Sequence, residues 1–340
     1  MSNVQVVQQN SRGLIGVPDW VLQTSTLTRL SLRKNQIALL SRDIAQLPLL
    51  KHLDFSENQL MSLPPEIGLL TELQSVLLAF NHLSVLPRTL SLCVNIESLD
   101  LKANRLTAIP SFFTRFVRLA RLDLANNVLQ AKKSEFAEAV VDNPLDALWN
   151  LTSLVSLSLD GNNLHQLPPQ ICNLTNLERL TSAGCGLTSV PVHVCALEKM
   201  RQLLISANSL SRLPRHMGNT LLQLMELDCD DTAVSDLPAS IGRCTNLTRL
   251  RMNNCPLIWP LDDLVMQGPS SVLRFLAERE AADLHAPPKQ QLYVSIDVAA
   301  VPSPLTKHTM SGLSRFYKDM LKNTDDVFRE KYDLSNNTSN

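Results

Sequence analysis

Apolar side chains recur along most of the chain with a spacing of 23 residues. Each copy follows the pattern LxxLxLxxNxL, whose first six residues alternate between apolar and polar. This alternation predicts a short half-buried strand, with its third and fifth side chains pointing outward. Positions are numbered below from the first residue of each copy. The copies begin at Leu27, Leu50, Leu73, Ile96 and Leu119 and, after a longer gap, at Leu154, Leu177, Met200, Leu224 and Leu247.

The second half of each copy, such as LMSLPPEIGLLTE, places proline early and predicts a turn followed by an irregular or short helical return path. One copy offers apolar side chains whose burial would contribute about 10–20 kcal/mol. Ordering its backbone and side chains costs on the order of 35 kcal/mol. A single copy therefore cannot fold alone. The predicted fold is an α/β solenoid of about eleven copies, counting a degenerate one from Val4, with a parallel sheet on its concave face.

The ninth position of most copies is asparagine, whose amide can satisfy backbone groups at the turn that lack strand partners. Cys185, Thr232 and Cys255 occupy this position in three copies and are interpreted as small polar substitutes. Cys229 falls on an inward apolar position, so the repeat accounts for these cysteines without chemistry. The asparagines are Asn35, Asn58, Asn81, Asn104, Asn127, Asn162 and Asn208.

Breaks in the period suggest how the chain is organised. We expect a degenerate repeat and N-terminal cap over 1–26, repeats over 27–262, a C-terminal cap over 263–285, and a tail over 286–340. The tail combines a linker, an amphipathic helix and a disordered end; the helix would cover either the chain's own surface or a partner's. An insertion near 130–153 is either a bulge that buries its own apolar residues or a projecting docking element.

Two stretches resemble the Ras-group leucine-rich repeat proteins, those of the Ras suppressor, Scribble/Erbin and plant intracellular Ras-group type. They are LKHLDFSENQLMSLPPEIGLLTE and the ending NCPLIWPLDDLVMQGPSSVLRFLAERE, where proline and glycine precede a short capping helix. The resemblance implies a leucine-rich repeat horseshoe. It also implies a cytosolic adaptor or signalling scaffold that binds a protein on its concave face, with a link to small GTPases. Because one fold hosts many functions, the resemblance defines the fold better than the function.

Composition narrows the partners. A net charge of −1, from 31 basic and 32 acidic residues, gives no reason to expect nucleic acid or anionic membrane as a ligand. No apolar run reaches the roughly 18 residues of a membrane span. Seven cysteines without a C-x-x-C pair are typical of reduced thiols, so we expect a cytoplasmic location, with cytoskeleton or cilium as alternatives.

The stretch LMELDCDDTAVSDLP contains the strongest candidate for chemistry. Glu226, Asp228, Asp230 and Asp231 could hold a divalent cation, act as an acid/base pair, or form a solvated acidic patch on the concave face. Side chains along one strand diverge, whereas a metal site needs oxygens that converge. We therefore expect the solvated patch, with no metal, no cofactor and no catalytic residue.

The outward positions predict a partner-binding surface. The leading hypothesis is a non-enzymatic interaction scaffold whose partner is a protein, such as a small GTPase or a cytoskeletal component. A structural subunit of a large cytoskeletal or ciliary assembly is the alternative, and an enzyme built on the acidic strand is the remote one. The predicted contact residues are Arg29, Arg33, Lys34, His52, Asp54, Leu77, Phe80, Asp100, Asp123, Leu204, Glu226, Asp228, Asp230, Asp231, Arg249 and Arg251.

Overall fold

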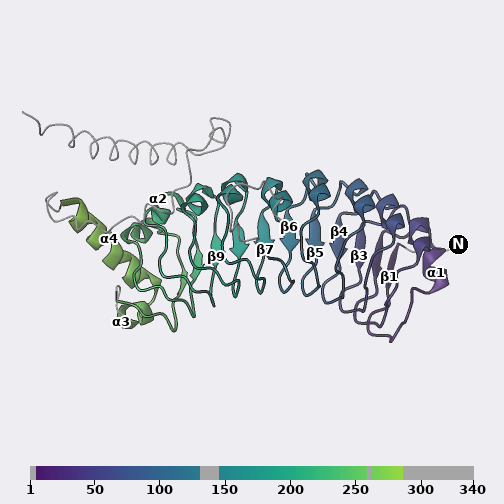
Figure 1. Cartoon of the computed structure of the whole chain (residues 1–340), viewed down its shortest axis with the longest axis horizontal. Helices are drawn as coiled ribbons and strands as arrows, with labels where there is room; N and C mark the ends of the chain where they lie inside the picture. Colours follow the sequence, from purple (N-terminus) through teal and green to yellow (C-terminus); the bar gives the residue numbers. More distant parts are fainter. Residues whose placement is uncertain (1–4, 131–144, 259–261, 286–340) are drawn as a thin grey trace, which may run out of the picture.

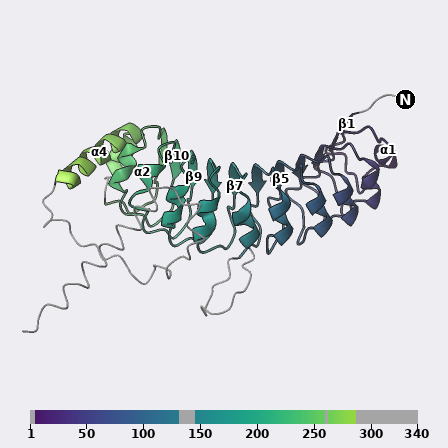
Figure 2. The same cartoon turned by 90° about the horizontal axis from the view of Figure 1, so that it is seen from above.

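The computed structural model describes residues 5–130, 145–258 and 262–285. Each copy makes one turn of a curved, open solenoid, with strands along one side and short helices along another (Figures 1 and 2). The predicted α/β solenoid is confirmed. Its parallel strands are β1 (Val6–Gln8), β2 (Arg29–Ser31), β3 (His52–Asp54), β4 (Ser75–Leu77), β5 (Ser98–Asp100), β6 (Arg121–Asp123), β7 (Ser156–Ser158), β8 (Arg179–Thr181), β9 (Gln202–Leu204), β10 (Glu226–Asp228) and β11 (Arg249–Arg251).

Neighbouring strands pair in the order of the sequence, and equivalent positions of successive copies lie side by side. Arg29 pairs with His52, for example, and Leu30 with Leu53. The fourth position, including both of these leucines, is buried. The third and fifth positions therefore form two continuous rows on the concave face.

The return paths are mostly single turns of 3-10 helix, as the proline-rich second half of each copy predicts. Proline precedes the helix in six copies, where its fixed φ suits a helix start and its missing N–H is not needed. The 3-10 helices are η1 (Arg42–Gln46), η2 (Pro65–Leu69), η3 (Arg88–Leu92), η4 (Ser111–Arg115), η5 (Asp146–Asn150), η6 (Pro169–Asn173), η7 (Val192–Ala196) and η8 (Ala239–Arg243). The first copy has the α-helical turn α1 (Asp19–Leu22) in the same place.

A ladder of buried asparagines ties the copies together. The Asn58 amide nitrogen donates to the carbonyl oxygens of Leu32 at 2.9 Å and Phe55 at 3.0 Å, and its oxygen accepts from the Ile37 N–H at 3.1 Å. The substitutes keep the donor role, since the Thr232 hydroxyl donates to the Cys229 carbonyl at 2.8 Å. The predicted role of the ninth position is confirmed.

The two irregular copies leave the sheet intact. Across the insertion, the Asn162 oxygen still accepts from the Leu129 N–H at 3.1 Å. Leu145 and Trp149, at the C-terminal end of the insertion, are buried in the hydrophobic core of the solenoid. The helix expected around Phe136 lies outside the described residues, as does the tail over 286–340. The copy that begins at Met200 has one extra residue, and its return path contains a turn of α-helix, α2 (Met217–Thr220), rather than a 3-10 turn.

Two helices, α3 (Asp262–Met266) and α4 (Pro269–His285), follow the last repeat. Helix α4 packs on η8, burying Val272 and Leu276. The backbones come so close that a Cβ added to Gly242 would lie 2.6 Å from the Ala277 nitrogen. No helix in the described ranges is long and apolar enough to cross a lipid bilayer.

Candidate protein-binding face

The eighth position has a left-handed backbone in every copy, with φ between 52° and 66°. The strands end at position five, so positions seven and eight lie on the turn that follows. Asp230, Asp231 and Phe80, which were predicted as contact residues of the concave face, therefore lie on turns and not on strands. They lie at the rim of the concave face, where the backbone turns to bring the ninth side chain inward. The residues at position eight are Ser11, Lys34, Glu57, Phe80, Ala103, Asn126, Gly161, Gly184, Ala207, Asp231 and Asn254.

Aspartate at position five has a local structural role. The Asp100 carboxylate accepts a hydrogen bond from the N–H of Lys102 at 3.0 Å, and Asp123 accepts from Ala125 at 2.9 Å. Asp54 and Asp228 do the same in their copies. The bond satisfies a position-seven N–H that has no strand partner. These acids consequently have a reason to be present apart from any ligand.

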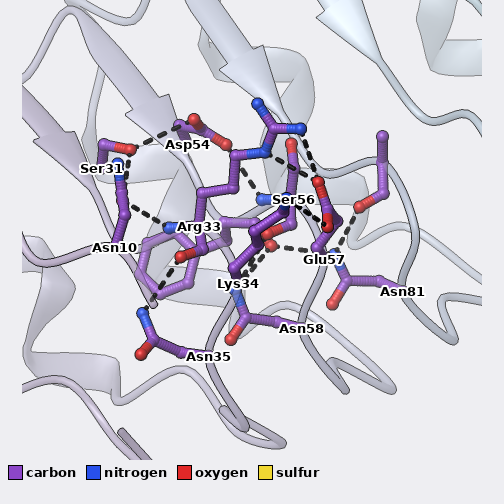
Figure 3. A network of polar contacts seen from close by, with 12 residues as sticks. Asn10, Ser31, Arg33, Lys34, Asn35, Asp54, Ser56, Glu57, Asn58 and Asn81 are labelled. Carbon is purple, nitrogen blue, oxygen red and sulfur yellow. Dashed lines mark hydrogen bonds and ion pairs between the residues drawn. The ribbon is translucent and has the colours of Figure 1, made fainter. Parts of the chain in front are cut away.

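At the N-terminal end of the face, two of the predicted basic contact residues are already paired. Arg33 and Lys34 lie 2.5 and 3.6 Å from the Glu57 carboxylate (Figure 3). The hydrogen bond from Arg33 lowers the pKa of Glu57, and the positive charges of both basic side chains lower it further. The Ser31 hydroxyl donates to Asp54 at 3.1 Å. The charges of Arg33, Lys34 and Glu57 are therefore paired with one another within the solenoid.

Arg29 and His52 are neighbours on β2 and β3, beside this network. Arg29 is exposed and His52 is half-buried. Burial lowers the pKa of His52, and the charges of Arg29 and Lys51 lower it further. His52 therefore adds little positive charge to this part of the face at neutral pH.

The acidic strand at the C-terminal end is also paired. Glu226 and Asp228 are only 5% and 7% exposed, so the expected solvated patch is wrong for these two residues. Arg249 lies 3.5 Å from Glu226 and Arg251 lies 3.6 Å from Asp228, each arginine coming from the adjacent position of β11.

Asp230 and Asp231 accept hydrogen bonds from the turn of the last copy. Asp230 accepts from the N–H of Asn253 at 2.6 Å, and Asp231 accepts from the Asn254 amide at 2.7 Å. Leu204 is half-buried on β9, directly beside Asp228. Structural contacts thus account for the acids that seemed the best candidates for chemistry.

The middle of the concave face is different. A shallow hollow of about 400 Å³ lies over β4 to β8, with Asp100 and Asp123 side by side in its lining. Both carboxylates are half-buried, and neither makes an ion pair with any described residue. Burial raises the pKa of Asp100, and the charges of Asp123 and Asp54 raise it further against the opposing effect of Lys102.

Apolar side chains adjoin this hollow on the N-terminal side. Leu77 is half-buried on β4, and its neighbours in the sheet are Asp54 and Asp100. Phe80 follows on the turn and is 51% exposed, which confirms its predicted exposure. The Lys102 ammonium lies 5.8 Å from the centre of the Phe80 ring.

Sequence reasoning missed several residues of the hollow. Asp160 accepts from the Thr181 hydroxyl at 2.9 Å and from the Ala183 N–H at 2.7 Å, so the next copy occupies its carboxylate. The missed residues lie at positions three, five and seven of their copies. They could have been found by comparing each of these positions across all copies. The missed residues include Lys102, Arg121, Asp160, Arg179 and Thr181.

The described residues offer little for catalysis. No three His, Cys, Asp or Glu side chains among them converge into a group that could hold a metal ion. Burial raises the pKa of Cys93 and Cys244 to about 11, and that of Cys195 to about 12. These thiols therefore stay protonated at neutral pH and are poor nucleophiles.

Sequence and structure comparisons agree on the fold. The family described as Leucine Rich Repeat matches residues 49–70 and 153–174. A search of curated proteins finds no match. Among solved structures, a leucine-rich repeat protein of Leptospira interrogans is 25% identical with a TM-score of 0.65, and the match covers 78% of this chain and 70% of that one.

Two receptors are also similar. A TDR receptor is 25% identical with a TM-score of 0.64, over 75% of this chain and 44% of that chain. The Arabidopsis receptor kinase HAESA, solved with the peptide hormone IDA and the co-receptor SERK1, is 25% identical with a TM-score of 0.56, over 75% of this chain and 46% of that one. This chain thus matches less than half the length of either receptor.

Fold and comparisons together define a leucine-rich repeat protein. Near both ends of its concave sheet, acidic and basic side chains form ion pairs within the protein, whereas the middle of the sheet contains a hollow.

Proposed function

We propose that this protein is a non-enzymatic interaction scaffold that binds a protein partner on its concave face. The observation that carries the proposal is the open middle of that face. There two carboxylates without ion pairs among the described residues line a hollow, and the half-exposed Phe80 lies next to Lys102, which also lines it. An exposed aromatic beside a groove is typical of the anchor residues that dominate protein interfaces. The complex of HAESA with a peptide hormone supports a polypeptide as the type of ligand that this fold can bind.

We further propose that the protein is cytoplasmic and takes part in small-GTPase-linked signalling. The location is supported by seven free cysteines, all within the described ranges, which suit a reducing compartment. The link to small GTPases rests on the resemblance of the repeat unit to Ras-group proteins. Binding to purified small GTPases, loaded in turn with GDP and with a GTP analogue, tests this link. If no small GTPase of a panel binds in either nucleotide state, the proposed link to small GTPases is wrong.

The concave-face proposal is tested by comparing baits. Wild-type protein and the variants Leu77→Ser with Phe80→Ala, and Val85→Ala, are used to capture proteins for quantitative mass spectrometry. Val85 is a matched control, because it is 65% exposed and lies beyond the Asn81 turn. We expect a partner that wild type and the control retain and the double variant loses. Identical capture by all three would contradict binding at this face, and a fixed stoichiometric complex through high salt would favour the structural-subunit alternative.

A further inference from the structure

The copy that contains Leu77 lacks an acceptor that its neighbours have. In the copies on either side, Asp54 and Asp100 accept the N–H of position seven. Leu77 cannot do so, and the equivalent N–H of Ala79 has no acceptor among the described residues. Ala79 is 4% exposed, so this donor is poorly solvated. A carbonyl oxygen from an extended partner segment would satisfy it.

The same copy presents the apolar side chains of the centre. Leu77 ends the strand two residues before Ala79, and Phe80 directly follows Ala79 on the turn. Phe80 holds a left-handed backbone conformation that is unusual for a bulky residue, at a position that is alanine or glycine in four other copies. A large apolar side chain of a partner could be buried against these two residues next to the unsatisfied N–H.

Negative charge adjoins this apolar spot on its C-terminal side. Asp100 and Asp123 occupy paired positions of β5 and β6, and no described cation lies within ion-pair distance of either. Adjacent like charges on neighbouring strands repel, and a partner's cation would relieve this repulsion. The pKa of Asp100 is raised mainly by burial, and the charges of Asp123 and Asp54 also act to raise it.

The described basic residues around the hollow make no ion pair with Asp100 or Asp123. Lys102 extends over the Phe80 ring, and Arg179 donates a hydrogen bond to Gln202 of the next strand. Arg121 shares β6 with Asp123 but makes no ion pair with it. The hollow thus contains two carboxylates that accept backbone hydrogen bonds but make no ion pair with the described basic residues in its lining.

We infer that the centre of the concave face, over β4 to β6, recognises an extended protein segment in which a large apolar residue is followed closely by lysine or arginine. The apolar side chain packs on Leu77 and Phe80, and the cation reaches Asp100 and Asp123. This inference rests on the proposed function and specifies the chemistry of its partner.

The test is a selection of random peptides of about 12 residues, displayed on phage, against the immobilised full chain. The enriched peptides are labelled with fluorescein, and their affinity is measured by fluorescence anisotropy at two salt concentrations. We expect an apolar residue within about three positions of lysine or arginine. Affinity should fall at least about tenfold with Phe80→Ala and with Asp100→Asn plus Asp123→Asn, and should weaken with salt.

These variants keep the local structure. Alanine already occupies position eight at Ala103 and Ala207. Asparagine retains an oxygen that can accept the position-seven N–H, so only the charge is lost. The matched control is Glu226→Gln with Asp228→Asn, an acidic pair that arginines already neutralise. We expect the control to stay within about twofold of wild type.

The outcomes separate the two proposals. Peptides that need Phe80 but are acidic or uncharged, or that ignore the Asp100 and Asp123 variants, would overturn this inference and leave the concave binding face standing. Peptides insensitive to every concave variant, or no enrichment at all, would overturn both.

Discussion

The centre of the concave face and its two ends carry similar numbers of charged side chains but use them differently. At the N-terminal end Arg33 and Lys34 both contact Glu57. At the C-terminal end two arginines of β11 cover the acids of β10. In the centre, Asp100 and Asp123 lie beside each other and make no ion pair with any residue that the structure describes. Charge density alone therefore does not locate a binding site in this solenoid.

What differs is the strand that follows. Because equivalent positions align from copy to copy, a side chain on one strand meets the same position of the next. Asp228 is followed by Arg251, which lies 3.6 Å away. Asp123 is followed by Ser158, which is too short and carries no charge. The residue at the same position of the next strand therefore determines whether an acid forms an internal ion pair or stays available to a partner.

The largest expected effect concerns the framework below both regions. Under the centre, the Asn104 amide donates to the carbonyl oxygens of Leu78 at 2.9 Å and Leu101 at 3.0 Å, and it accepts from the Leu83 N–H at 3.0 Å. Asn104→Ala leaves buried backbone groups without partners and should cost about 3 kcal/mol or more. Thr232→Ala, which loses the substitute bond near the C-terminal end, should cost about 1 kcal/mol. Urea unfolding followed by circular dichroism checks both, and equal losses would contradict the special role of the amide.

The second-largest effect is expected from a substitution that gives the centre the kind of charge pair found at the C-terminal end. Ser158→Arg places a cation beside Asp123 as Arg251 lies beside Asp228. Affinity for the selected cationic peptides should fall about tenfold, because the carboxylate is then neutralised. Ser158→Gln, similar in length but uncharged, is the control. An equal loss in both variants would indicate a steric rather than an electrostatic effect.

Most of the fold could be predicted from the sequence, because it follows from local periodicity. The 23-residue spacing fixes the strands, the rows and the inward ninth position, and the amide of Asn58 does what its position required. The left-handed eighth position was missed. Lys34, Glu57 and Phe80 share no chemistry there. The residue types at this position that favour a positive φ are those of Gly161, Gly184, Asn126, Asp231 and Asn254.

The site was predicted only in part. Phe80 and its exposure follow from the repeat, whereas the burial of Glu226 and Asp228 does not. Whether Arg249 and Arg251 fold back over these acids depends on the paths of long flexible side chains in three dimensions. A row assignment gives the neighbours of a charge but does not say which of them reach it.

A smaller effect is expected when an end is made to resemble the centre. Arg249→Ser with Arg251→Ser exposes Glu226 and Asp228, which then lose their ion pairs. Both arginines are more than half exposed, so the cost should be about 1 kcal/mol. Glu226 keeps its hydrogen bond from Gln202 at 2.8 Å. The variant should also gain weak, salt-sensitive affinity for cationic peptides by anisotropy, and no gain would show that free carboxylates alone do not make a site.

The smallest effect concerns the acid dependence of stability. Because burial and neighbouring acids raise the pKa of Asp100, the folded state binds more protons than the unfolded state between the ordinary and the raised pKa. The contribution of Asp100 to the free energy of unfolding therefore increases as pH falls through that window, and at neutral pH this carboxylate disfavours the fold. Asp100→Asn should stabilise the protein at neutral pH by less than about 1 kcal/mol and lose its advantage over wild type as the pH falls. Urea midpoints of wild type and variant across the acid range measure this difference, in which the other titrating groups cancel. A destabilised variant at neutral pH would mean that an internal cation already compensates Asp100, and the centre would then resemble the ends.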